Sequence, residues 1–326
     1  WRAMIDAGLT LHLEPVEGRG NTLTVAGERE DLNAVPPFWL CLDEMNLAPV
    51  EQYFADYLSV LETREWQWDG EHFSYVCDPI LKPSIFNEVD DNAKLRHSLG
   101  FDDARYDDAW CYFCEKGMGL PFNLIVAGTV NMDETTHGFS RKVIDRALTF
   151  DFGEFFPNDF NEFFNPSSQP KALSYPAVSS ASQQALSSCC DAGGNKTIAF
   201  MNAVNQALEG TPFKLAYRAL NELLLEVASH NPQTELELKA VWDDFLMCKV
   251  LPRIEGDTDK LRYAPSVLDD LLTLLGQEFA EFWEGETRPD FYRENTDGTD
   301  LNIGCRRKRK LTWMKARLDT SSFTSF

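Results

Sequence analysis

The sequence of 326 residues lacks the features that would place it in a membrane or a secretory pathway. It has no apolar run of about 18 residues, so we expect no membrane span. Its first residues do not combine a basic region with an apolar stretch, so we expect no signal peptide. No internal repeat is visible. These absences favour a non-repetitive globular protein of the cytoplasm.

Positive charge is scarce, because 30 Lys and Arg residues face 52 Asp and Glu residues and give a net charge of −22. Such a charge argues against broad, non-specific nucleic-acid binding. Residues 306–317 are the exception, since they contain basic side chains and no acid. Two interpretations stay open. The favoured one is a solvated helix start or a patch that faces the acidic body of the protein, and the other is a contact for DNA, RNA or a partner.

The eight cysteines do not form the pattern of a disulfide framework, which belongs to short secreted chains. Cys111-x-x-Cys114 has the spacing of a metal or redox site. A zinc site needs about four ligands, and no second CxxC or paired His is evident. Free or structural thiols are the favoured interpretation. A zinc site completed from scattered residues (Cys77, His97, Cys189 and Cys190) and a redox pair are the alternatives.

A phosphate-binding loop of the form Gly-x-x-x-x-Gly-Lys-Ser/Thr is also missing. The Gly-rich stretches at 17–20 and 191–196 do not fit it. Lys196 is followed by Thr197, but the first Gly of the motif is absent at the required spacing and no apolar strand precedes it. The chain begins with Trp1 rather than Met. We therefore expect a fragment whose phosphate loop either precedes Trp1 or was lost.

The most informative segment that is present runs from Phe38 to Leu42 and ends in Asp43 and Glu44. Prolines on both sides bound this apolar run, which predicts a short buried strand. Acids at the carboxyl end of a buried parallel strand lie where open α/β sheets bind ligands. One acid can hold Mg²⁺ and its neighbour can orient a water, as nucleotide hydrolysis requires.

Two further apolar runs predict strands at 124–130 and 148–152, separated by a helix at 140–147. Asn131 follows the first of these strands. Three strands with polar ends indicate part of a parallel α/β sheet whose site lies at the carboxyl edge. The remaining local patterns predict a hairpin or an insertion at 9–25, a hairpin at 64–76 and a helix at 49–63. They also predict an irregular acidic insertion with helical turns at 86–120 and helices from 197 to 284.

The domain organisation expected from these patterns has three parts. Residues 1–156 form the α/β core. Residues 157–195 are rich in Pro, Ser, Asn and Ala, which is typical of a linker. Residues 196–326 form an all-helical domain that includes the basic C-terminal segment.

Five ordered motifs carry a resemblance to a known family. They are Leu-Asp-Glu-Met-Asn-Leu-Ala at 42–48, Gly-Thr-Val-Asn-Met-Asp-Glu-Thr-Thr at 128–136, Phe-Ser-Arg-Lys-Val-Ile-Asp-Arg-Ala at 139–147, the segment 214–224, and Val-Leu-Pro-Arg-Ile-Glu-Gly at 250–256. With the ending at 313–326, which together with 250–256 resembles longer McrB-like ATPases, the chain resembles AAA+ ATPases of the dynein-related and MoxR-like branch, and among these most closely the McrB-like ATPases of restriction systems. The resemblance implies a partial P-loop-type parallel sheet core followed by a C-terminal helical lid.

The resemblance also implies site residues, cofactors and partners. It makes Asp43 the Mg²⁺ residue, acting through water, and Glu44 the residue that activates the attacking water. Asn131 matches sensor 1, Arg146 an arginine finger that acts on a neighbouring subunit, and Arg218 sensor 2. Asp133 is a weaker candidate across the subunit interface. The implied cofactors are Mg²⁺ and ATP, with GTP as the alternative. The implied partners are further copies in a hexameric ring, a nuclease subunit, and DNA through that complex.

Structural interpretations stand beside these functional ones. Asp43 and Glu44 would also suit a strand-end cap, and Asn131 would suit a turn that satisfies backbone groups. Arg146 would suit an intrachain salt bridge, and Arg218 a solvated helix position. His137 is interpreted as a hydrogen-bonded loop residue. The alternative to the enzyme is a non-catalytic scaffold that kept the fold and lost nucleotide binding.

Overall fold

The computed structural model describes residues 1–87, 92–131, 139–155, 160, 163–164, 173–262, 265–294 and 300–326. The chain is a mixed α/β protein with two compact units. Unit 1 comprises Trp1–Val143 and Lys171–Ser179, and unit 2 comprises Ile144–Pro170 and Ser180–Phe326. The predicted core, linker and lid, with boundaries at 156 and 195, stay a prediction. In the described residues, no helix is both long and apolar enough to cross a membrane.

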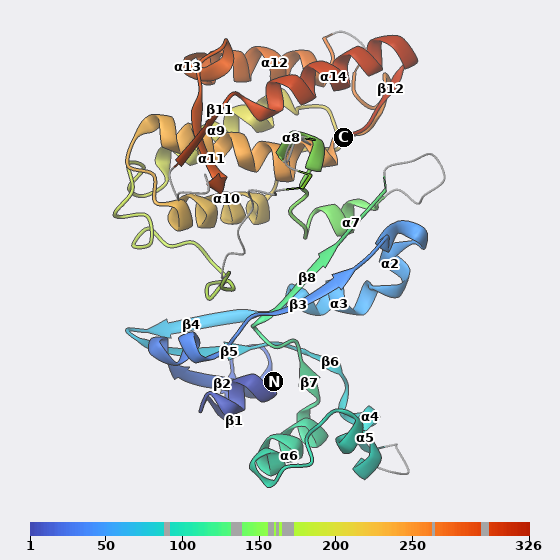
Figure 1. Ribbon diagram of the computed structural model, residues 1–326, viewed down its shortest axis with the longest axis vertical. Coiled ribbons are helices and arrows are strands. Elements are labelled where there is room, and N and C mark those ends of the chain that lie inside the picture. Colours follow the sequence, from blue (N-terminus) through green and yellow to red (C-terminus); the bar gives the residue numbers. More distant parts are fainter. Residues whose placement is uncertain are drawn as a thin grey trace. The chain divides into compact units, whose positions relative to one another are not determined.

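The largest sheet of unit 1 is antiparallel, with strand order β1-β2-β5-β4 (Figure 1). Both predicted hairpins are confirmed, because β1 pairs with β2 and β4 pairs with β5. Gly70 has φ of 62° and allows the tight turn after Asp69. The strands of this sheet are β1 (Thr10–Val16), β2 (Gly20–Glu28), β4 (Glu65–Asp69) and β5 (His72–Val76).

Aromatic side chains form the core beneath this sheet. Phe73 and Tyr75 alternate with exposed or half-buried residues along β5 and are buried. Trp66 and Trp68 of β4 stack with ring centroids 6.1 Å apart. The chain returns to this unit at 173–179, where the Trp68 indole Nε1 donates to the carbonyl of Ala177 over 2.8 Å. The return segment therefore covers the tryptophan side of the sheet.

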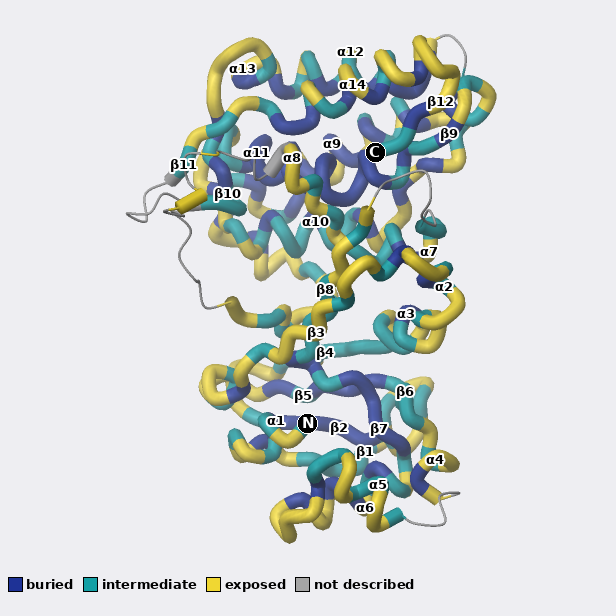
Figure 2. Tube along the Cα trace, turned by 45° about the vertical axis from the view of Figure 1, so that its right-hand side comes forward, coloured by how far each residue is buried: buried dark blue, intermediate teal, exposed yellow. Residues whose placement is uncertain are grey.

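The predicted strands 38–42 and 124–130 exist and pair in parallel as β3 (Phe38–Leu42) and β8 (Leu124–Gly128) (Figure 1). The prediction that β3 is buried is wrong. Phe38, Trp39 and Leu40 are 64%, 44% and 39% exposed. Among the described residues β3 pairs with β8 alone, so this part of the chain provides no wider parallel sheet to cover it. Figure 2 shows the exposed course of β3.

Short helices fill the rest of unit 1. The predicted helix 49–63 is split at Phe54, whose φ of −108° and ψ of 9° break the helical path. The insertion at 86–120 is more helical than predicted. The short strands here are β6 (Pro79–Leu81) and β7 (Met118–Gly119). The helices are α1 (Arg2–Asp6), η1 (Arg29–Ala34), η2 (Met45–Leu47), α2 (Val50–Tyr53), α3 (Ala55–Leu61), α4 (Pro83–Asn87), α5 (Asn92–Ser98), η3 (Ala104–Tyr106), α6 (Asp107–Lys116) and α7 (Arg141–Ile144).

The predicted third strand at 148–152 does not form. Residues 147–151 have no regular structure, and α8 (Phe152–Phe155) begins within the predicted range. The amide of Thr149 donates to the carbonyl of Cys248 over 2.9 Å, and the ring of Phe150 packs edge-on against Tyr292. These contacts fix the segment on unit 2 and replace a strand partner.

Unit 2 is mostly helical, as predicted for 197–284. In α11 every residue from Leu238 to Phe245 is buried, which marks it as the central helix (Figure 2). Ser266 caps α12 through a reciprocal capping box with Asp269. The elements are α9 (Asn195–Ala207), α10 (Tyr217–His230), α11 (Glu235–Phe245), η5 (Leu246–Val250), η6 (Leu251–Arg253), β9 (Gly256–Asp257), α12 (Val267–Glu278), α13 (Ala280–Trp283), β10 (Arg288–Glu294), β11 (Asp300–Ile303), α14 (Arg306–Ser321) and β12 (Phe323–Thr324).

Candidate functional site

The parallel pairing of β3 with β8 brings the two predicted motif ends together in unit 1. Leu42 is paired with Gly128 in register, so Asp43 and Thr129 follow at the same sheet edge. The amide of Thr129 donates to the carbonyl of Leu42 over 2.9 Å. The carboxyl edge of a parallel pair is where an open α/β sheet presents functional side chains.

Thr129 connects the two acids that follow β3. Its hydroxyl donates to Asp43 Oδ1 over 2.5 Å and accepts from the backbone amide of Glu44 over 2.8 Å. One side chain therefore fixes both the Asp43 carboxylate and the backbone of its neighbour. The sequence analysis quoted Thr129 within a motif and gave it no role. The register of the two strands is the signal that finds it.

Glu44 has a backbone conformation that is unusual for its residue type. Its φ of 48° and ψ of 46° lie in the left-handed region, which costs a non-glycine residue about 1–2 kcal/mol. Such strain persists where the surroundings enforce it, and it clusters at functional sites. The side chain is also held, because Asn131 Nδ2 donates to Glu44 Oε1 over 3.0 Å. The structure thus brings together Asp43, Glu44 and Asn131, three of the site residues that the sequence analysis predicted.

A second layer of contacts supports this group. The side-chain amide of Asn46, which is buried, donates to the carbonyl of Asn131 over 2.9 Å. Tyr53 donates its hydroxyl hydrogen to the carbonyl of Met45 over 2.7 Å. A Cβ at Gly128 would overlap the sulfur of Met45, so any larger residue at position 128 would require the Met45 side chain to shift.

This group of side chains exposes oxygen atoms to solvent that could act as metal ligands. Asp43, Glu44 and Asn131 are all exposed. Carboxylate oxygen is the donor that Mg²⁺ prefers, and this ion keeps several water or phosphate ligands. Groups of three or more His, Cys, Asp or Glu placed to hold a metal do not occur in the described part of the chain. A magnesium ion held by Asp43 therefore stays a prediction, and water and phosphate would have to supply most of its ligands.

The other two predicted site residues belong to unit 2. Arg146 follows α7 and is half-buried, and Arg218 is exposed in the first turn of α10. Both make interactions within the protein. Asp133 and His137 lie outside the described residues.

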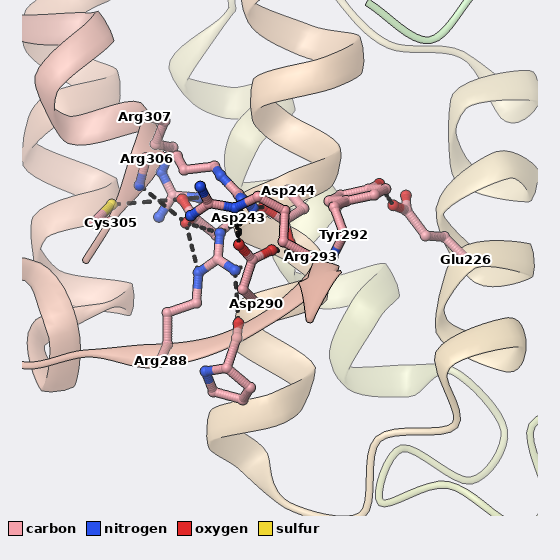
Figure 3. Close-up of polar contacts among 11 residues, drawn as sticks. Glu226, Asp243, Asp244, Arg288, Asp290, Tyr292, Arg293, Cys305, Arg306 and Arg307 are labelled. Carbon is pink, nitrogen blue, oxygen red and sulfur yellow. Dashed lines mark hydrogen bonds and ion pairs between the residues drawn. The ribbon is translucent and has the colours of Figure 1, made fainter. Parts of the chain in front are cut away.

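A buried ionic cluster lies in unit 2 and was not expected from the sequence. Figure 3 shows how its carboxylates and guanidinium groups converge from α11, β10 and α14. Arg288 Nη2 donates to Asp243 Oδ2 over 2.6 Å, and Arg306 Nη2 donates to Asp290 Oδ2 over 2.7 Å. Its members are Asp243, Asp244, Arg288, Asp290, Arg306 and Arg307.

The two adjacent aspartates of the cluster differ in their electrostatics, since burial raises the pKa of Asp244 in spite of Arg288 and Arg306. Burial would raise the pKa of Asp243, but Arg307 and Arg288 outweigh burial and lower it. Arg307 is 0% exposed, and its guanidinium lies 3.7 Å from the ring centroid of Phe279. Since losing one partner of such a network costs about 3–5 kcal/mol, the cluster fixes the packing of the three elements.

The cluster also decides between the two interpretations of the basic segment 306–317. Arg306 and Arg307 are buried in it. Lys308 pairs with Glu284, Lys310 with Asp151 and Lys315 with Asp269. The segment therefore faces acids of its own unit, as one form of the favoured interpretation expected, whereas the other form, a solvated helix start, is wrong because Arg306 and Arg307 are buried.

A carboxyl group outside the cluster titrates abnormally. Burial raises the pKa of Glu226 to about 8, against the opposing effect of the hydrogen bond from Tyr292. Glu226 lies on α10, where Tyr292 reaches it from β10 (Figure 3). The group is therefore protonated over a large part of the neutral pH range.

The cysteines and the cavities do not add to the predicted site. All eight cysteines are free thiols. Cys111 is exposed, and the sulfur of Cys114 accepts from Asn92. A groove of about 680 Å³ in unit 2 is lined by Trp283, Trp313 and Lys308 among others, and its lining includes none of the predicted site residues.

Comparison with known proteins gives one match. The family described as "Domain of unknown function (DUF8727)" matches residues 178–323, somewhat less than half of the chain. No curated protein and no solved structure is significantly similar to the chain. The match includes Arg218 and the whole ionic cluster, whereas Asp43, Glu44, Asn131 and Arg146 precede it.

Proposed function

We propose that this chain contributes part of a nucleoside-triphosphate hydrolysis site in a ring-forming AAA+ ATPase of the McrB-like kind. ATP is the proposed nucleotide and GTP the alternative. The single observation that carries the proposal is the hydrogen-bonded group of Asp43, Thr129, Glu44 and Asn131 at the carboxyl ends of β3 and β8. Its residue types and placement match the needs of phosphoryl transfer, in which positioning and electrostatics supply most of the catalysis.

Glu44 has the role of orienting the attacking water and accepting its proton. The amide of Asn131 holds one carboxylate oxygen of Glu44, which leaves the other oxygen for that water. Holding the base in one orientation reduces the entropy lost in reaching the transition state. Thr129 orients Asp43 toward the same edge. Asp43 would hold a magnesium ion through water, and that ion would neutralise charge on the phosphoryl oxygens.

Arginines complete such a site because negative charge spreads over the phosphoryl oxygens in the transition state. In the proposal Arg146 reaches the site of a neighbouring copy, and Arg218 contacts the nucleotide of its own copy. The functional form is then a closed ring of identical subunits, proposed as a hexamer. The sequence has no phosphate-binding loop, so in this proposal another part of the protein or assembly supplies that loop.

Hydrolysis by the full-length protein tests the proposal. We expect Glu44→Gln to reduce kcat for ATP or GTP about 10²–10³-fold, because it removes the base and keeps the side-chain shape. Glu71→Gln is the matched control, since Glu71 is an exposed acid of unit 1 that pairs with Arg29. Equal rates in wild type and Glu44→Gln would remove the enzyme proposal.

A non-catalytic scaffold is the second candidate, favoured by the missing phosphate-binding loop. A scaffold would retain assembly with its partners when Glu44, Asn131 and Arg146 are all replaced. The enzyme would lose hydrolysis in each single variant. Measuring assembly and hydrolysis on the same preparations separates the two candidates.

The biological proposal is defence against foreign DNA together with a nuclease subunit, and it rests on the McrB-like motifs. We expect the nuclease to cleave DNA in the presence of the full-length protein and nucleotide, and not with the Glu44→Gln variant. Cleavage that is unaffected by leaving out the full-length protein would overturn it.

A further inference from the structure

Lys249 of unit 2 is a lysine in an environment where lysines are rare. It lies in the π-helix η5 and is 2% exposed. Burial lowers its pKa, and Glu222 opposes that effect. A buried ammonium group needs partners for its donors. A π-helical turn between α11 and η6 is itself a frequent mark of a functional position.

The partners of Lys249 lie on both sides of Arg146. Its Nζ donates to the carbonyl of Asp145 over 2.9 Å and to the carbonyl of Ala147 over 3.1 Å. Because these two carbonyls flank residue 146, the ammonium group fixes the backbone from which Arg146 projects.

Two neighbours of Lys249 hold the same segment. Arg253 Nη2 lies 3.2 Å from Asp145 Oδ1. The carbonyl of Cys248 accepts from the amide of Thr149 over 2.9 Å. The continuous helical run from η5 to η6 therefore attaches to residues 145–149 through four contacts, of which Lys249 makes two, Arg253 one and the carbonyl of Cys248 one.

The third partner of Lys249 joins this segment to α10. Its Nζ lies 2.7 Å from Glu222 Oε2. Glu222 is four residues after Arg218 on α10, so the two side chains share a helix face. Lys249 thus links the segment that carries Arg146 to the helix that carries Arg218.

We propose that Lys249 is a positioning residue that, with Glu222, sets the place of Arg146 and couples it to α10, the helix of Arg218. This inference rests on the proposed function. A shift of α10 on nucleotide binding in one subunit then moves the arginine offered to the next. A misplacement of about 1 Å in a reacting group costs about 10²-fold in rate, so the link matters for hydrolysis.

Hydrogen exchange of the full-length protein tests the link without nucleotide. We expect Lys249→Met, which keeps chain length and apolar volume, to accelerate exchange of the Thr149 amide about tenfold, because local opening becomes easier. Lys315→Met is the control, since Lys315 pairs with Asp269 and Asp319 away from this segment. Glu222→Gln is the milder variant if Lys249→Met unfolds, with the same direction expected. Unchanged exchange at Thr149 in a folded variant overturns the link.

Mixed rings test the positioning role, because a general folding defect is not repaired by a neighbour. Lys249→Met alone and Glu44→Gln alone should each lose hydrolysis, by about 10²-fold. When the two variants are mixed in equal amounts, about a quarter of the interfaces should join an unchanged Glu44 to an Arg146 from a subunit with an unchanged Lys249, and activity should recover accordingly. A mixture of Lys249→Met with Arg146→Ala should not recover. Absence of recovery in the first mixture overturns the positioning role.

The two failures are distinguishable. If the wild-type protein hydrolyses neither nucleotide, the proposed function fails, and the exchange experiment still decides whether Lys249 fixes residues 145–149. If wild type is active and Lys249→Met is equally active, the proposed function stands and the inference about Lys249 is wrong.

Discussion

Thr129 performs a task that neither acid can perform alone. Its hydroxyl donates to one oxygen of Asp43 and accepts from the amide of Glu44, so it sets the distance between a carboxylate and a strained backbone. A hydrogen bond to a charged group contributes about 1.5–3 kcal/mol. This is large for a single exposed side chain.

We expect Thr129→Val to lower kcat of the full-length protein about 10–100-fold, because the isosteric side chain can make neither bond. Thr129→Ser retains the hydroxyl and should stay within a few-fold of wild type. Steady-state hydrolysis of ATP and GTP measures both variants. A valine variant as fast as the serine variant would contradict the role given to the hydroxyl.

Glu226 gives a pH dependence of stability. Its pKa is about 8 when folded and near 4.5 when unfolded, so the folded state holds the proton more tightly. Stability contributed by this group is present below about pH 4.5 and is lost as the pH rises through 8. We expect Glu226→Gln to stabilise the protein by about 4 kcal/mol at pH 8.5 relative to its effect at pH 5, because nearly three pKa units of the shift act between these pH values. Urea unfolding at both pH values measures this, and a pH-independent effect would contradict it.

The sequence predicted the acids and Asn131 as one site because their motifs end apolar strands. It gave no role to Thr129 or Lys249, for different reasons. Thr129 is recognised once the register of β3 with β8 is known. Lys249 depends on contacts with residues 145–147, about 100 positions earlier in the chain, which no local pattern reports.

The β3–β8 pair shows what an apolar run does and does not reveal. Its composition correctly predicted two strands, since β-branched and aromatic residues suit extended backbone. It wrongly predicted burial of β3, because burial depends on neighbouring elements rather than on composition. At 148–152 the composition again favoured a strand, but the Thr149 amide is bonded to Cys248 instead.

We expect Gly128→Ala to destabilise unit 1 by roughly 1 kcal/mol, because the new methyl group overlaps the side chain of Met45. Met45→Ala should remove most of that penalty when combined with it. A double-mutant cycle from urea unfolding, followed by tryptophan fluorescence, gives the coupling energy. Additive effects of the two changes would contradict the overlap.

The ionic cluster governs the stability of unit 2 as a whole. Its carboxylates come from residues 243, 244 and 290 and its arginines from 288, 306 and 307, so it joins three elements that are remote in sequence. The sequence predicted that the basic segment faces acids but not which acids. The number of charged residues does not show which of them are buried as ions, because the fold determines which acid pairs with which arginine.

We expect Asp243→Asn to destabilise unit 2 by about 3–5 kcal/mol, since it leaves two buried arginines without their full counter-charge. Lys315→Met, which removes a partly exposed ion pair, should cost less than about 1 kcal/mol. Each unit has a separate hydrophobic core, so calorimetry should show the change in the transition of unit 2. Equal shifts in both transitions would contradict this assignment.

The return of the chain to unit 1 at residues 171–179 has a consequence for protein synthesis. Trp66 and Trp68 receive hydrogen-bond partners from Ser179 and Ala177, so this side of the sheet stays uncovered until residue 179 has left the ribosome. By then Ile144–Pro170, the first part of unit 2, has already emerged. The N-terminal unit therefore cannot finish folding before the second unit begins to appear, and the usual N-to-C order of domain folding does not apply to this chain.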